Sequence, residues 1–110
     1  MKFEIMQYAD ISTGYLEGSD LELISDRGCP MHIAEEDDGR GSFFYVSDDE
    51  EIFGENIARA RTFGLSERFI SIMRELHRQK VPYVRFDSDG SCIRDDSGEC
   101  LPFAAEEKTQ

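Results

Sequence analysis

A stripe of apolar residues at helical spacing is the feature of this 110-residue chain that most limits its fold. The stripe lies between Gly64, which favours the end of a helix, and Pro82, whose ring cannot continue one. Ser66 is placed to cap the start of the intervening helix. A helix with one apolar face needs another apolar surface to cover that face. The stripe consists of Leu65, Phe69, Ile72, Met73 and Leu76.

Four segments have the pattern of β-strands that could supply this surface. Residues 2–9 alternate between two faces, as half-buried strands do. Residues 31–36 and 42–47 flank a turn-forming stretch and predict a hairpin. Residues 83–87 form a further short strand rich in aromatic and β-branched side chains.

Two more helices are predicted outside the stripe. Ser19 and Glu22 have the spacing of a capping box, which predicts a short helix that ends near Gly28. Residues 48–63 predict a second helix, which Asp48 or Asp49 caps at its positive N-terminal end.

The order of these elements predicts an α+β fold, in which a small, mostly antiparallel sheet is covered by two or three helices. A chain of this length suits one domain, which we expect over residues 1–105. Residues 106–110 are polar and predict a frayed tail.

The net charge of −12 limits the classes of partner. Such a surface repels the phosphates of nucleic acids and of anionic lipids, so direct binding to nucleic acid or to a membrane is disfavoured. It favours encounter with a basic protein. The alternative is that the acidity only keeps the protein soluble.

The charge is distributed unevenly along the chain. Residues 57–86 carry seven basic and two acidic residues, a net charge of +5, whereas the remainder carries five basic and 22 acidic residues, or −17. Some of the cations have local acids, such as Glu75 beside Arg78 at i,i+3. Arg68, Arg74 and Arg78 lie on the polar side of the second long helix. They either meet acids of the same chain or form a binding surface of their own, including one for a second copy.

The cysteine pattern predicts free thiols in a reducing cytoplasm. Three cysteines occur without a Cys-x-x-Cys motif, and the first residues lack the apolar run of a signal peptide. Cys29 and His32 have the spacing of half a zinc site, which Cys92 and Cys100 would complete. Their wide separation favours buried thiols instead, so we expect no metal and no cofactor.

The segment from Asp87 to Ser91 resembles the nucleophile motif of the haloacid-dehalogenase phosphatases. In that family a first Asp attacks phosphorus and a second acts as acid and base. The family places its motif on the first strand of a large parallel sheet, a context that this chain does not share. Asp89-Gly90 therefore predicts a hairpin turn into a strand through Cys92 and Ile93. A metal-assisted hydrolase that uses Asp87 and Asp89 is the less favoured alternative.

Three segments together resemble a family of small uncharacterised bacterial proteins found on phages and other mobile elements. The segments are 11–16, Leu65-Ser66 with Phe69, and 84–90 with Leu101-Pro102-Phe103. The family pattern is an early Ser-Thr-x-x-Leu, a late Phe-Asp-x-Asp-Gly and a closing Leu-Pro. The resemblance implies a mobile-element origin and no catalytic residues.

The sequence thus predicts a non-enzymatic acidic protein that inhibits a basic, nucleic-acid-binding host defence protein. An anti-CRISPR or anti-restriction protein of this kind would mimic DNA and occupy the partner's groove. Acids two residues apart on a strand are separated by about 6.7 Å, comparable to successive phosphates. A small regulatory homodimer of the antitoxin type is the alternative. The predicted partner-binding residues are Glu35, Glu36, Asp37, Asp38, Asp48, Asp49, Glu50, Asp87 and Asp89.

Overall fold

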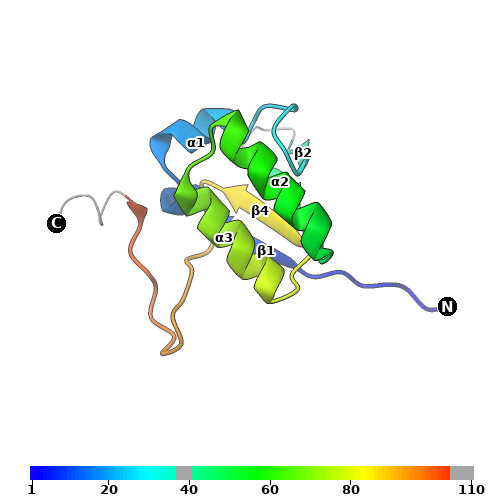
Figure 1. Ribbon diagram of the computed structural model, residues 1–110. Helices are drawn as coiled ribbons and strands as arrows, with labels where there is room; N and C mark the ends of the chain where they lie inside the picture. Colours follow the sequence, from blue (N-terminus) through cyan, green and yellow to red (C-terminus); the bar gives the residue numbers. More distant parts are fainter. Residues whose placement is uncertain (37–40, 105–110) are drawn as a thin grey trace.

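The structure is a computed structural model that describes residues 1–36 and 41–104. Within these residues it confirms the predicted α+β class (Figure 1). The predicted frayed tail, residues 106–110, lies outside the described part. The elements are β1 (Tyr8–Ser12), a 3-10 turn (Thr13–Tyr15), α1 (Gly18–Leu23), β2 (His32–Glu35), β3 (Gly41–Tyr45), α2 (Glu50–Phe63), α3 (Glu67–Arg78) and β4 (Tyr83–Asp87).

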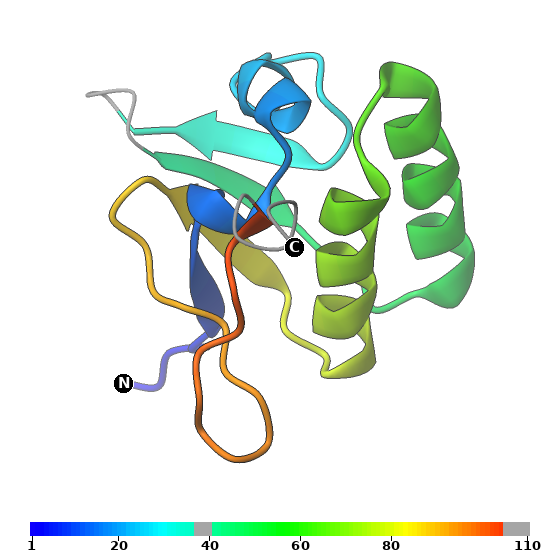
Figure 2. The same cartoon turned by 90° about the vertical axis from the view of Figure 1, so that its left-hand side faces the viewer.

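The described strands form one sheet in the order β1-β4-β3-β2. β1 runs parallel to β4, while β4 with β3 and β3 with β2 are antiparallel. The sheet is therefore mostly antiparallel, as predicted. Helices α2 and α3 lie side by side on one side of the sheet, which gives a two-layer arrangement (Figure 2).

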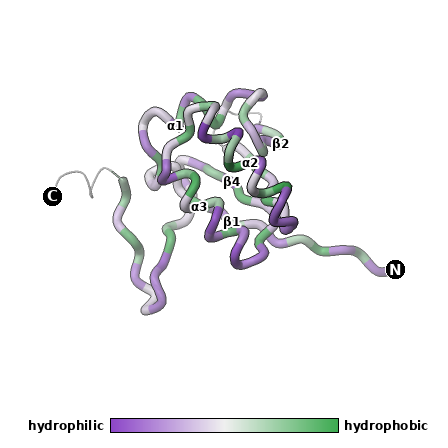
Figure 3. Tube along the Cα trace, viewed as in Figure 1, coloured by the Kyte–Doolittle hydropathy of each residue, from purple (hydrophilic) through white to green (hydrophobic). Residues whose placement is uncertain are grey.

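Both long helices begin at predicted caps and α2 ends before Gly64 as predicted, whereas α3 ends at Arg78, well before Pro82. The side chain of Asp49 accepts a hydrogen bond from the backbone of Ile52, and that of Ser66 accepts one from Phe69. Gly64 separates the helices in the left-handed conformation, with φ of 109°. Hydrophobic and hydrophilic segments alternate along both helices, as expected when one face of each is buried (Figure 3).

The core lies between these helices and the sheet. Four members of the predicted stripe are buried, and Ile72 is half-buried. Phe44 of β3 and Phe86 of β4 meet Phe69 of α3, with ring centroids 5.6 and 5.8 Å apart. Ile70, outside the predicted stripe, is also fully buried, because α3 packs against both the sheet and α2.

The predicted strand over residues 2–9 is wrong at both ends. β1 begins at Tyr8 and continues to Ser12, in register with β4 from Tyr83 to Asp87. Pro82 precedes β4 and has no backbone N–H to extend the ladder. Residues 1–7 consequently extend away from the body of the molecule (Figure 1).

The predicted cap of the first helix is also wrong. Glu17 is the N-cap of α1 and forms a capping box with Asp20, two residues earlier than Ser19 and Glu22 would give. Asp20 is completely buried and accepts hydrogen bonds from the backbone and hydroxyl of Ser66. A carboxylate in this position joins the start of α1 to the start of α3, which no local pattern can show.

The chain after β4 does not turn into a hairpin. It crosses the end of β1, where the backbone N–H of Ser12 donates to the carbonyl of Ser91 over 3.0 Å. Gly90 lies so close to β1 that an added Cβ would be 2.5 Å from the backbone of Ile11. The predicted strand through Cys92 and Ile93 is absent from the described residues, where an isolated bridge joins Arg94 to Cys100.

Candidate interaction surface

The face of the sheet opposite α2 and α3 is covered by no described helix (Figure 2). We call it the open face. The strand register arranges its side chains in three rows across β1, β4 and β3. Successive rows are about 6.7 Å apart, because side chains on one face recur every second residue. The rows are Tyr8–Tyr83–Tyr45, Asp10–Arg85–Phe43 and Ser12–Asp87–Gly41.

The first row places three tyrosines side by side. The rings of Tyr45 and Tyr83 lie 5.5 Å apart, and the ring of Tyr8 meets Phe43 of the second row at 6.1 Å. Tyr8 and Tyr45 are 57% and 41% exposed. Large aromatic rings with this exposure are typical of surfaces that bind another molecule. The tyrosine row therefore gives the open face an exposed aromatic part.

The other rows hold a charged cluster centred on Arg85. Its guanidinium forms ion pairs with Asp10, at 3.0 Å, and with Glu36 and Asp87. The hydrogen bond to Glu36, followed by those to Asp10 and the charge of Asp87, raises the pKa of Arg85 above its ordinary value. Three carboxylates surround one cation, so the cluster carries a net negative charge.

Glu36 reaches this cluster over the backbone of Gly41. A Cβ at Gly41 would lie 2.5 Å from the carboxylate of Glu36 and 3.2 Å from the guanidinium of Arg85. The glycine thus leaves the space in which this ion pair forms, a role that the sequence did not indicate.

The structure separates the predicted partner-binding acids into two groups. Glu35, Glu36 and Asp89 lie at the end of the sheet where β4 finishes, whereas Asp48, Asp49 and Glu50 follow β3 at the opposite end. β3 itself spans about 13 Å between these ends. Asp37 and Asp38 lie outside the described residues. The acids therefore flank the open face instead of forming one row.

Besides Glu36, which pairs with Arg85, two of the predicted acids already have structural roles. Asp87 is 2% exposed, pairs with Arg85 and accepts the backbone N–H of Asp89 at 2.6 Å. Asp49 caps α2. The predicted phosphate-like row of Asp87 and Asp89 is not formed, because the side chain of Asp87 is buried. The same contacts hold the side chain of Asp87 within the sheet.

The basic face of α3 is partly neutralised within the chain. Arg78 pairs with Glu75 as predicted, and Arg61 pairs with Glu67 at 3.0 Å. The hydrogen bond from Arg78 lowers the pKa of Glu75 to about 2. Arg68 donates to the backbone carbonyl of Tyr15 at 2.8 Å. These contacts favour the intramolecular interpretation of the basic residues.

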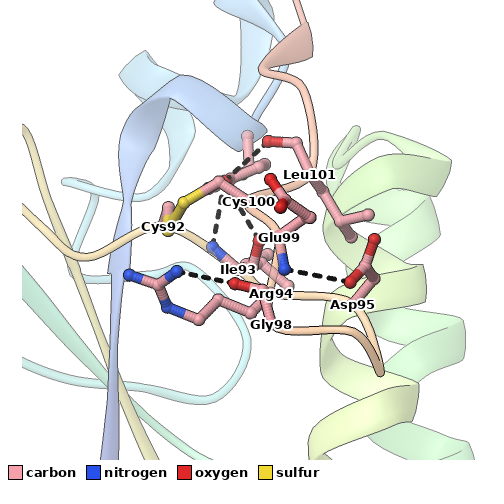
Figure 4. Close-up of a disulfide and its surroundings, with 9 residues drawn as sticks. Cys92, Ile93, Arg94, Asp95, Gly98, Glu99, Cys100 and Leu101 are labelled. Atoms are coloured by element: carbon pink, nitrogen blue, oxygen red, sulfur yellow. Dashed lines mark hydrogen bonds between the residues drawn. A yellow bond between two sulfur atoms is a disulfide. The ribbon is translucent and has the colours of Figure 1, made fainter.

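The cysteines depart from the prediction of free thiols. Cys92 and Cys100 form a disulfide (Figure 4). Cys29 is free and buried. The four-residue zinc site is therefore wrong, and no group of potential metal ligands is found in residues 1–36 and 41–104. Burial, followed by the charges of Asp26 and Asp20, raises the pKa of Cys29 to about 12.

The two histidines are packed against aromatic rings. His77 stacks on Phe53 with ring centroids 4.1 Å apart, and its Nδ1 lies 2.8 Å from the carbonyl of Ser47. His32 meets Phe44 edge to face at 5.4 Å, and its Nε2 is buried without a hydrogen bond from the described residues. Neither histidine lies on the open face.

The disulfide closes a loop that Tyr15 ties to the body. The Tyr15 hydroxyl accepts from the backbone of Ile93 and donates to the carbonyl of Leu101, both at 2.9 Å. Leu101 in turn donates to the carbonyl of Ile93 at 2.7 Å (Figure 4). The base of the loop is thereby fixed beside β1.

Sequence reasoning found the acids but missed the open face. Alternation showed that Phe43 and Tyr45 share one face of a strand and Phe44 the other. It did not show which face the helices cover, because both carry aromatic residues. Tyr83 and Arg85 are two residues apart on one strand, so their side chains share a face. This spacing was a signal that an aromatic and a charged side chain lie together there.

No protein-family model, curated protein or solved structure matches this chain. None of the helices in the described part has the length and apolar composition needed to span a bilayer.

Proposed function

We propose that this protein is a non-enzymatic interaction protein that binds a basic protein partner through its open face. The observation that carries the proposal is the row of tyrosines on that face, with carboxylates at both ends of the sheet. Aromatic rings supply contact area at small entropic cost, and peripheral charges steer encounter.

The charge of the open face supports one kind of partner over others. The Arg85 cluster is net negative, and Glu35 and Asp48 are exposed beyond it. Two copies placed face to face would bring these like charges together, which disfavours a homodimer through this face. Nucleic acid is disfavoured for the same reason. A basic protein surface is complementary to both ends of the sheet.

A narrower proposal concerns the partner's own ligand. A basic groove that binds nucleic acid attracts an acidic surface of this kind. The charge of −17 outside residues 57–86 and the resemblance to mobile-element proteins support an inhibitor of a host nucleic-acid-binding defence protein. Action in the cytoplasm stays a prediction. The Cys92–Cys100 disulfide means that free thiols no longer support a reducing compartment.

Charge reversal at both ends of the open face tests the proposal. Glu35→Lys combined with Asp48→Lys changes two exposed acids that flank the face. Glu22→Lys combined with Glu55→Lys is the matched control, because it changes the net charge equally on helices α1 and α2. Binding of host proteins to each immobilised variant is measured at about 50 mM and about 500 mM salt, with and without duplex DNA.

We expect the unchanged protein and the control to retain a basic protein at low salt and to release it on addition of salt or DNA. The open-face variant should retain much less. Equal retention by both variants would contradict the proposed surface. Retention that DNA does not reduce would contradict occupation of the nucleic-acid groove.

A further inference from the structure

We infer that the tyrosine row of the open face recognises arginine side chains, so that the partner presents an arginine-rich segment. This inference rests on the proposed function and specifies the chemistry of its contact. Tyr8, Tyr83 and Tyr45 are the residues that carry it.

The strand register spreads the tyrosines across three neighbouring strands. Three neighbouring strands contribute one tyrosine each, and neighbouring strands are about 4.8 Å apart. The ring of Tyr8 also approaches Phe43 across β4. The result is two neighbouring aromatic pairs, Tyr45 with Tyr83 and Tyr8 with Phe43, which suit planar groups that stack on them.

Carboxylates lie on both sides of this aromatic surface. Asp10 follows Tyr8 on the same face by two residues, or about 6.7 Å, and Asp48 follows Tyr45 by three residues. Asp10 uses Oδ1 for Arg85, while its Oδ2 makes one long contact of 3.5 Å with Ser91. A cation stacked on Tyr8 would have the carboxylate of Asp10 on the same face, and one on Tyr45 would lie in a shallow pocket that Asp48 and Lys80 also line.

Arginine fits this arrangement better than lysine does. A guanidinium is planar, weakly hydrated and able to stack on a ring while it donates to a carboxylate, whereas an ammonium is a strongly hydrated point charge. The same face already holds one guanidinium by its carboxylates, since Arg85 pairs with Asp10, Glu36 and Asp87.

Peptides of nine arginines and of nine lysines test the inference because they have equal charge. Their affinities for the full chain are measured by fluorescence anisotropy at about 0.15 M salt. We expect the arginine peptide to bind about fivefold more tightly or better, from several exposed cation–π contacts. Tyr45→Leu with Tyr83→Leu should abolish this preference and leave the affinity for the lysine peptide nearly unchanged.

Phe3→Leu is the matched control, because Phe3 is an exposed aromatic residue in the segment that extends away from the sheet. Tyr8→Leu, on the edge strand, repeats the test if the double variant does not fold, as judged by its melting curve. Equal affinity for both peptides, or a preference that survives loss of the tyrosines, would overturn the inference and leave the proposed function standing. Failure to bind either peptide would overturn both. A dimeric mass that falls to monomer in Tyr45→Leu would show that a second copy occupies the face and would overturn the inference.

Discussion

At the scale of single residues, burial decides which groups retain their ordinary chemistry. Cys29 is 4% exposed and lies close to Asp26 and Asp20. Both effects disfavour a thiolate, since a charged sulfur would lose water and meet negative charge. Cys29 is therefore an inert core thiol, although its sequence context suggested a metal ligand.

The raised pKa of Cys29 predicts how stability depends on pH. The unfolded thiol ionises near pH 9 and the folded thiol near 12. The folded state thus keeps a proton that the unfolded state loses, and the free energy of unfolding should fall as pH rises between these values. The slope from one proton is at most about 1.4 kcal/mol per pH unit.

Urea denaturation of the unchanged protein and of Cys29→Ala, from about pH 8 to about pH 10.5, measures this contribution. The difference in unfolding free energy between the two proteins should be constant below about pH 9 and shrink above it. A difference that stays constant across the whole range would mean that the thiol is not protected.

At the scale of elements, the helices follow local rules and the segment after β4 does not. Capping residues and the αL glycine define α2 and α3 within a few residues of sequence. Asp89-Gly90 has the sequence of a hairpin turn, yet Gly90 is needed because the chain crosses the backbone of β1. The dipeptide Asp89-Gly90 is thus compatible both with a hairpin turn and with a close crossing over another strand. The local sequence does not distinguish these two structures.

Gly90→Ala should therefore destabilise the protein by about 1–3 kcal/mol, as overpacking does, because backbone atoms of Ile11 and Ser12 occupy the space of the new methyl group. Gly54→Ala is the matched control. Gly54 lies within α2 with open space around it, so alanine there should stabilise by about 0.5–1 kcal/mol. Thermal or urea denaturation measures both, and a neutral Gly90→Ala would mean that the segment does not pack on β1.

At the scale of the whole molecule, the disulfide holds the segment after β4 in place. Residues 92–100 lack regular secondary structure apart from the Arg94–Cys100 bridge. Their position depends on the Cys92–Cys100 bond and on the hydroxyl of Tyr15. Within this loop, Cys92 and Ile93 are partly buried against the core between the helices and the sheet.

Reduction of the disulfide should lower the free energy of unfolding by about 2–3 kcal/mol, because a loop of nine residues is then free in the unfolded chain. Urea denaturation with and without a dithiol measures the loss. Cys92→Ser with Cys100→Ser should be unaffected by the dithiol, whereas Cys29→Ala should still respond. An unchanged midpoint after reduction would show that the bond contributes nothing.

The sequence by itself determined the α+β class, both long helices with their caps, the hairpin and most of the stripe that α3 buries. Each of these follows from residues close together in the chain, through propensity, capping and periodicity. The sequence also determined the acidic character on which the proposed partner depends.

Only the tertiary structure decided where β1 pairs, which cysteines bond, and which face of the sheet stays open. Parallel pairing of β1 with β4 joins residues about 75 positions apart, and local alternation carries no information about such a partner. The Cys92–Cys100 bond depends on a chain path set by Gly90 and Tyr15. The tyrosine row exists because α2 and α3 cover the opposite face, a choice made by packing between distant segments.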